Sequence, residues 1–225
     1  EVVRFLVESG ANKDQGRTDN GSTPLFIAAH QGHLEVVQFL VESGANKDQG
    51  RTDNGATPLF AAAQKGDVEV VHLLVESGSN KDQGRTDNGA TPLFMAAGGG
   101  HFEVVQLLVE SGANMDRGKT DDGTTPLFMA AQEGHLEVVR LLVESGANMD
   151  QGTSDDGTTP LFAAAQDGQL EVVRLLVESG ANMDQGRTDN GETPLFMAAQ
   201  EGHFEVVQLL VESGANMDQG DDNGA

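Results

Sequence analysis

Cysteine, tryptophan and tyrosine are all absent from this chain of 225 residues. The absence of cysteine excludes a disulfide framework and a metal site built from thiolates. It also favours an intracellular, cytoplasmic location, because disulfides are rare there. No apolar run approaches the roughly 20 residues that a membrane-spanning helix needs, and no secretory signal peptide is visible. We therefore expect no direct insertion into a membrane.

Basic residues are scarce: 13 lysines and arginines stand against 36 aspartates and glutamates, for a formal net charge of −23. Residues 1–112 carry 8 basic and 15 acidic residues (−7), and residues 113–225 carry 5 and 21 (−16). Affinity for nucleic acid depends on basic side chains at phosphates, so no nucleic acid partner is expected. Two interpretations of the charge stay open: solubility, or attraction of a basic partner or of cations.

The most informative feature that is present is a repeat. The tetrapeptide Thr-Pro-Leu-Phe starts every 34 residues, at Thr23, Thr57, Thr91, Thr125, Thr159 and Thr193. A strict period of this length indicates units that stack on their neighbours rather than one globular core. We predict a single array over residues 1–225, which we expect to be a segment of a longer protein. Its parts are a half repeat at 1–18, repeats at 19–52, 53–86, 87–120, 121–154, 155–188 and 189–222, and the start of a further repeat at 223–225.

The first half of the repeat at 53–86 predicts a short helix. Thr57 can cap that helix with its hydroxyl, and Pro58 suits the first helical position, where no N–H is needed. The helix is expected to continue to Gln64. It ends at Gly66, because glycine favours the left-handed position after a helix.

The second half predicts another helix, from about Val68 to Glu76, followed by Gly78. Its apolar stripe is expected to consist of Val68, Val71, Leu74 and Val75. Residues 80–89 are polar and end in Asn88-Gly89, a strong signal for a tight turn. The predicted fold class is therefore all-α: an α-solenoid of stacked helix-turn-helix units with polar hairpin fingers.

One combined motif recurs in every repeat. In residues 53–86 it consists of Gly55, Thr57-Pro58-Leu59, Ala62-Ala63, Gly66, Glu69-Val70-Val71, Leu73-Leu74 and Gly78. The motif resembles that of the ankyrin repeat family, and the resemblance covers the whole chain, about six and a half repeats.

Two departures from the family pattern stand out. The family usually has histidine after Thr-Pro-Leu, a residue that commonly ties one repeat to the next by hydrogen bonds. This chain has phenylalanine there, which would replace polar contacts by apolar packing: Phe26, Phe60, Phe94, Phe128, Phe162 and Phe196. The period of 34 also exceeds the usual ~33, and the extra residue falls in the finger, for example within residues 48–53.

Histidine recurs between the two helices, in the pattern Gly-His-Leu/Phe-Glu at His33, His101, His135 and His203. With the nearby glutamate it could form a metal or acid–base pair. Asp67 and Gln169 occupy the same position in other repeats, so we interpret these histidines as turn residues. No nucleophile–base arrangement, phosphate-cradling loop or cofactor motif is visible, and we predict neither an enzyme nor a cofactor.

The fingers are acidic. Their aspartates are expected to stack into a ladder along one edge: Asp48 with Asp53, Asp82 with Asp87, Asp116 with Asp121 and Asp122, and Asp150 with Asp155 and Asp156. Calcium favours oxygen-rich loops, but no finger has the spacing of a helix–loop–helix calcium site. We favour a solvated acidic face and predict no metal site, with calcium binding as the open alternative.

The resemblance implies that the chain binds other proteins through a concave face of finger tips and first helices, at solvent-facing positions. These partner-binding positions are Asp19, Asn20, Ser22, His30, Gln31, Asp53, Asn54, Ala56, Gln64, Lys65, Asp87, Asn88, Ala90, Asp121, Asp122, Thr124, Gln132, Glu133, Asp155, Asp156, Thr158, Gln166, Asp167, Asp189, Asn190, Glu192, Gln200 and Glu201. They predict a non-catalytic scaffold whose partner is a protein, either basic or another copy of the chain. The near-identity of the repeats leaves an alternative: a structural element or subunit of a larger assembly or filament, associating through uncapped ends.

Overall fold

The computed structural model describes residues 9–218, and the regular secondary structure within that range is entirely α-helical. The predicted half repeat at 1–18 and the repeat at 189–222 lie partly outside the described residues, and the further repeat at 223–225 lies wholly outside them. The chain divides into two compact units, the first ending at Asn114 and the second beginning at Met115. The expectation of a single array stays a prediction.

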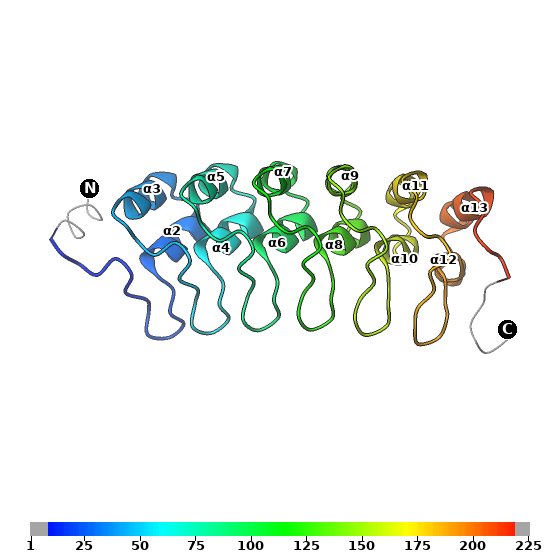
Figure 1. Ribbon diagram of the computed structural model, residues 1–225, viewed down its shortest axis with the longest axis horizontal. Helices are drawn as coiled ribbons and strands as arrows, with labels where there is room; N and C mark the ends of the chain where they lie inside the picture. The colour runs from blue at the N-terminus through cyan, green and yellow to red at the C-terminus, as the bar shows by residue number, and fades with distance from the viewer. Residues whose placement is uncertain (1–8, 219–225) are drawn as a thin grey trace. The chain divides into compact units, whose positions relative to one another are not determined.

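The first unit consists of helix pairs (Figure 1). The pairs are α2 (Pro24–Gln31) with α3 (Leu34–Glu42), α4 (Pro58–Lys65) with α5 (Val68–Glu76), and α6 (Pro92–Gly98) with α7 (Phe102–Glu110). The first helices α2, α4 and α6 pack side by side in one row, and α3, α5 and α7 pack in a second row. A polar finger precedes each first helix and projects away from the row of second helices (Figure 1).

The second unit repeats this arrangement. Its pairs are α8 (Pro126–Gln132) with α9 (Leu136–Glu144), α10 (Pro160–Gln166) with α11 (Leu170–Glu178), and α12 (Pro194–Glu201) with α13 (Phe204–Glu212). Helix α10 packs between α8 and α12, and α11 packs between α9 and α13. Across residues 9–218, every helix is too short or too polar to cross a membrane. The prediction of stacked helix-turn-helix units is confirmed.

Helix α4 begins and ends at the residues that its sequence predicts. In α4 the extended Thr57 accepts a hydrogen bond from the backbone N–H of Phe60 at its hydroxyl oxygen, 3.1 Å away, and Pro58 is the first helical residue. Gly66 follows the helix with φ of 75°, in the left-handed region that favours glycine. These local signals fix the length of a helix that could not persist alone in water.

Removal of the helix cap is expected to weaken the first unit. Thr57 is buried, so Thr57→Val keeps the shape of the side chain but leaves the Phe60 N–H without its acceptor. We expect the free energy of unfolding to fall by about 1–2 kcal/mol, measured by urea unfolding followed by circular dichroism. Thr57→Ser retains the hydroxyl and is the control, and an equal loss in both variants would contradict this role of the cap.

The buried face of the second helices is shifted from the one that the sequence predicts. In α5, Val70, Val71 and Leu74 have no exposed surface, whereas Val68 and Val75 are only half-buried. The expectation of full burial was wrong for these two residues. Helix α5 is covered by α4 of its own pair and by α3 and α7 on either side, so the buried surface centres on Val70 and Val71. Val68 and Val75 remain at the rim of a groove beside α7.

The fingers are narrow loops rather than paired strands. The backbone N–H of Arg51 donates to the carbonyl of Ala56 (3.0 Å), and the N–H of Gly55 donates to the carbonyl of Arg51 (2.9 Å). Thr57 then begins the next helix cap, so no residues remain to extend a ladder. One further bond joins neighbouring fingers, from the Thr52 N–H to the carbonyl of Asn20 (3.0 Å).

Candidate functional site

The first aspartate of each finger joins neighbouring repeats. The Oδ1 atom of Asp48 accepts a hydrogen bond from the backbone N–H of Asn80 (2.8 Å), and Gln83 Nε2 donates to the carbonyl of Asp48 (3.1 Å). We call the first aspartates of the fingers the joint aspartates. In each of the other pairs the backbone N–H of the asparagine likewise donates to the aspartate carboxylate: Asp14–Asn46, Asp82–Asn114, Asp116–Asn148, Asp150–Asn182 and Asp184–Asn216.

The first aspartates of the ladder therefore also connect repeats, and the expectation of a solvated acidic face stays a prediction. A backbone N–H of the next repeat donates a hydrogen bond to one carboxylate oxygen of Asp48, Asp82, Asp116 and Asp150. Hydrogen bonds from a backbone N–H to an ionised carboxylate are stronger than those between neutral groups. Among residues 9–218, no three His, Asp or Glu side chains lie together in a group that could hold a metal ion.

Two of the interhelical histidines, His101 and His203, contact the preceding repeat. The Nε2 atom of His101 lies 3.1 Å from the carbonyl oxygen of Gln64, at the end of α4, and His203 Nε2 lies 2.8 Å from that of Gln166. Gln169 occupies the same position and donates to the carbonyl of Gln132 (3.1 Å). The contacts support the interpretation of these residues as structural turn residues.

The finger tips divide the predicted site residues into two kinds. The second tip residue folds its own loop, since Asn54 Oδ1 accepts from the N–H of Ala56 (3.0 Å). The same bond forms at Asn20, Asn88, Asp122, Asp156 and Asn190. The first tip residue is exposed in every repeat; we call this set the tip aspartates: Asp19, Asp53, Asp87, Asp121, Asp155 and Asp189.

Most tip aspartates pair with a basic residue two positions earlier. Arg17 pairs with Asp19 at 2.7 Å, Arg187 with Asp189 at 2.8 Å, and Lys119 with Asp121 at 3.2 Å. Arg51 with Asp53 and Arg85 with Asp87 form the same pair. Threonine stands at this position in one finger, Thr153 before Asp155.

Five predicted partner-binding residues are buried and do not face solvent as expected: Ser22, Ala56, Ala90, Thr124 and Thr158. They lie between the turn glycine and the helix-capping threonine, where the loop returns to the helix and its backbone closes the finger. The prediction of solvent-facing positions was wrong for these residues. Glu192, at the same position in the last described repeat, is half-buried and lies 3.9 Å from Arg187.

The predicted residues at the ends of the first helices are mostly exposed. They are His30, Gln31, Gln64, Lys65, Glu133, Gln166, Asp167, Gln200 and Glu201, with Gln132 half-buried. In the first unit a hollow of about 290 Å³ lies between the end of α2 and α4. It is bounded by His30, Gln31, Gln64 and Lys65. Lys65 Nζ donates to the carbonyl of Gln31 (3.0 Å), which joins the ends of α2 and α4.

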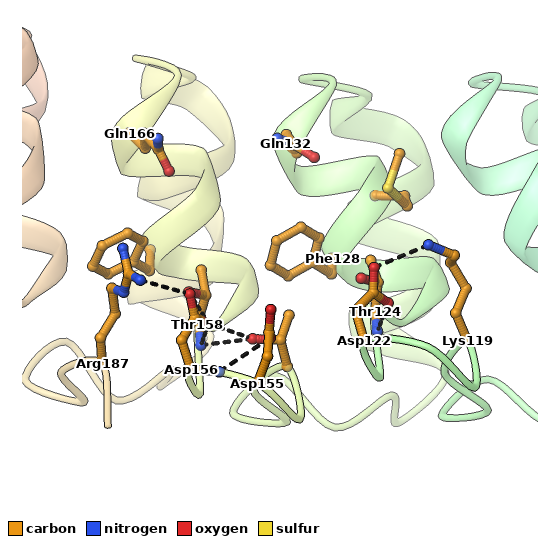
Figure 2. Close-up of a pocket in the computed structure, with 13 residues that line it drawn as sticks. Lys119, Asp122, Thr124, Phe128, Gln132, Asp155, Asp156, Thr158, Gln166 and Arg187 are labelled. Carbon is orange, nitrogen blue, oxygen red and sulfur yellow. Dashed lines mark hydrogen bonds and ion pairs between the residues drawn. The ribbon is translucent and has the colours of Figure 1, made fainter. Parts of the chain in front are cut away.

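A pocket of about 340 Å³ in the second unit gathers predicted residues from two repeats (Figure 2). The predicted residues that line it are Asp122, Thr124, Gln132, Asp155, Asp156, Thr158 and Gln166. Sequence reasoning did not select the others, which include Lys119, Phe128, Thr153 and Arg187. The departure of Thr153 from the basic residue of other repeats was the available signal.

Two carboxylates in this pocket have pKa values below the ordinary value. Burial alone would raise the pKa of Asp156, but hydrogen bonds from Thr153 and Thr158 and the charge of Arg187 outweigh it and lower the pKa. Arg187 Nη2 lies 2.8 Å from Asp156 Oδ2. The pKa of Asp122 is lowered in the same way, as bonds from Thr124 and Lys119 outweigh burial.

The lowered pKa of Asp156 predicts a dependence of stability on pH. A carboxylate whose pKa is lower in the folded chain contributes stability above its unfolded pKa, and loses it as the pH falls through the folded pKa. Asp156→Asn should cost about 1–2 kcal/mol at neutral pH, and the difference from the unmodified chain should shrink below about pH 4. Urea unfolding at several pH values measures this, and a difference independent of pH would contradict it. Thr153→Val, which removes one donor to Asp156, should reproduce part of the change.

Comparison with known proteins agrees with this architecture. The family described as ankyrin repeats (3 copies) matches residues 1–85, 79–153 and 146–221. The crystal structure of the human ASB11 ankyrin repeat domain is 31% identical, with a TM-score of 0.79 over 90% of this chain and 89% of that chain. That of Bcl-3, a unique member of the IkappaB protein family, is 29% identical, with a TM-score of 0.80 over 92% of each chain. A search of curated proteins gave no match. The chain belongs to the ankyrin repeat family.

Proposed function

We propose that this chain is a non-catalytic scaffold that binds a protein partner on the surface formed by the tip aspartates and the ends of the first helices. Ankyrin repeat domains generally mediate protein–protein interaction. The observation that carries the proposal is the pocket in the second unit, where polar side chains from two successive repeats meet around a half-buried phenylalanine.

The charge of this surface favours a basic partner. The tip aspartates are exposed, and residues 113–225 carry a formal charge of −16, from 5 basic and 21 acidic residues. Complementary charge speeds association and disfavours acidic partners. Because exposed charges are screened by salt, binding is expected to weaken as the salt concentration rises.

The proposal can be tested by selecting binders from a library of displayed peptides. A tip variant carries Asp121→Asn, Asp155→Asn and Asp189→Asn. A control variant has the same change in charge on the exposed ends of α9, α11 and α13, through Glu144→Gln, Glu178→Gln and Glu212→Gln. Selected peptides should be basic and should bind the tip variant about tenfold more weakly, with the control unchanged. Failure to enrich any binder, or equal weakening by both variants, would contradict the proposal.

The assembly alternative has its own supporting observation. On the last described helix pair, Phe204 is 70% exposed and Val211 39% exposed, and Met217 after them is 72% exposed. If these side chains meet another copy of the chain, the mass should rise with concentration above 23.6 kDa, and Phe204→Glu should restore the monomer. Light scattering measures this, with refractive-index detection because Trp, Tyr and Cys are absent. A constant mass of 23.6 kDa would contradict assembly.

A further inference from the structure

In the first unit, the finger that follows a second helix covers the phenylalanine of the same 34-residue repeat. The guanidinium carbon of Arg51 lies 5.6 Å from the centre of the Phe26 ring, and that of Arg85 lies 5.9 Å from the centre of the Phe60 ring. A cation at this distance from a ring face is attracted by the ring quadrupole. The covered rings are only 5% and 3% exposed.

A carboxylate holds each of these arginines in place. Arg51 pairs with Asp53, and Arg85 pairs with Asp87, in each case two residues further along the finger. The repeat thus contains a three-part unit of ring, guanidinium and tip carboxylate. The ring and the guanidinium come from one 34-residue repeat, and the carboxylate stands at the start of the next.

In the second unit one such site lacks its guanidinium. Phe128 is followed 25 residues later by Thr153, where Phe26 and Phe60 are followed by Arg51 and Arg85. Threonine is too short to cover the ring, and its hydroxyl donates to Asp156 instead (2.6 Å). Phe128 is only half-buried, unlike Phe26 and Phe60.

The carboxylate of this site is also available. Asp155 stands where Asp53 and Asp87 bind arginine, it is exposed, and it has no ion pair within the described part of the chain. Its Oδ1 accepts one bond from the N–H of Asp156 (3.0 Å), which leaves the other oxygen for a ligand. The ring and the carboxylate therefore persist without the cation that joins them elsewhere.

The space that the missing side chain leaves is the pocket of about 340 Å³ in Figure 2, where Phe128, Asp155 and Gln132 surround it. The cations at its two ends are already engaged, Lys119 with Asp121 and Asp122, and Arg187 with Asp156 and Asp189. The volume is at the low end of the ~300–1,000 Å³ of ligand pockets. It suits one long side chain rather than a folded element.

We propose that this pocket receives an arginine side chain of a protein partner, with its guanidinium against Phe128 and bonded to Asp155. The inference rests on the proposed function and names the chemistry that this surface recognises. Arginine fits better than lysine, because a planar guanidinium can stack on a ring face while its N–H groups donate to a carboxylate oxygen. The carboxylates of Asp122, Asp155 and Asp156 in the wall disfavour an acidic side chain.

The test uses the smallest probe that carries the group, N-acetyl-arginine-N-methylamide, titrated into the ¹⁵N-labelled chain and followed by NMR. The neutral citrulline analogue is the matched ligand, with nearly the same shape and no charge. We expect saturable shifts at the amides around Phe128, Thr153 and Asp155, with a Kd on the order of 1–10 mM for a single side chain. The citrulline analogue should bind about tenfold more weakly.

Variants of the chain separate this site from other acidic surface. Thr153→Arg should fill the pocket from within and abolish the shifts, as Arg51 does at Phe26. Phe128→Leu and Asp155→Asn should each weaken binding about tenfold. Glu178→Gln removes one negative charge at the exposed end of α11, outside the pocket lining, and should leave binding unchanged. An unchanged dispersion of amide signals shows that each variant is folded.

Two results would overturn the inference: equal shifts from both ligands, or binding of the arginine probe that survives Thr153→Arg. Neither result would affect the broader proposal, which the peptide selection tests separately. Selected binders that are insensitive to Thr153→Arg would leave the scaffold function standing and place it elsewhere on the tip surface. If the selection enriches no peptide but the arginine probe still binds, the scaffold function is refuted and the arginine site is not.

Discussion

Leu74→Ala should lower the free energy of unfolding of the first unit by about 2–5 kcal/mol. Leu74 has no exposed surface and lies in α5, which packs against α4 and between α3 and α7. Truncation removes apolar contacts and leaves a cavity that these short, closely stacked helices can fill only in part. Because each repeat contacts only its neighbours, the loss should be local.

Native-state hydrogen exchange can locate this loss. We expect protection to fall most in α3, α5 and α7, and less in the second unit. Gln38→Ala, on the exposed face of α3, is the control and should change stability by less than about 0.5 kcal/mol. An equal fall of protection over residues 9–218 would contradict local coupling between neighbours and would indicate that the two units unfold together.

Gly50→Ala should cost about 1–3 kcal/mol. A methyl group built at Gly50 would overlap the backbone carbonyl of Gly55, in the turn of the same finger. Backbone atoms cannot rotate away as a side chain can, so the finger would have to open, and the bond from the Arg51 N–H to Ala56 would be strained. The same close approach recurs at Gly16, Gly84, Gly118, Gly152 and Gly186.

Thermal unfolding followed by circular dichroism measures this effect. Gln64→Ala is a suitable control, because its side chain is exposed and alanine favours the helix at that position. A stability of Gly50→Ala equal to that of the control would show that the finger accommodates a side chain there.

Local chemistry made the helices predictable. Thr57, Pro58 and Gly66 start and stop α4 through contacts within a few residues, so their effect can be read without knowing the fold. The burial of Ala56 and Thr158 could not be read in this way. It depends on the angle at which the finger returns to its helix, which only the folded loop determines.

Contacts between repeats were the main element that the sequence did not predict. Asp48 and Asn80 are 32 residues apart, and the repeating pattern alone does not say which polar residue of one finger meets which backbone group of the next. The pocket at Phe128 could not be predicted for the same reason, because it depends on contacts that the repeating pattern does not specify. Thr153 differs from Arg51 and Arg85 in the sequence, but the difference acquires a meaning only once those arginines are seen to lie over Phe26 and Phe60.

The joint aspartates have a consequence for how such a chain can change its length. Every described joint uses the same donor and acceptor at an offset of 32 residues. In the present chain the Asn114 N–H donates to Asp82. Removal of residues 53–86 would place Asp48 at the position of Asp82 relative to Asn114, so the new junction would have the same hydrogen-bonding groups as the old one. Duplication of a 34-residue segment would create a junction of the same kind. The number of repeats can therefore change by whole units in the gene without any compensating substitution at the junctions.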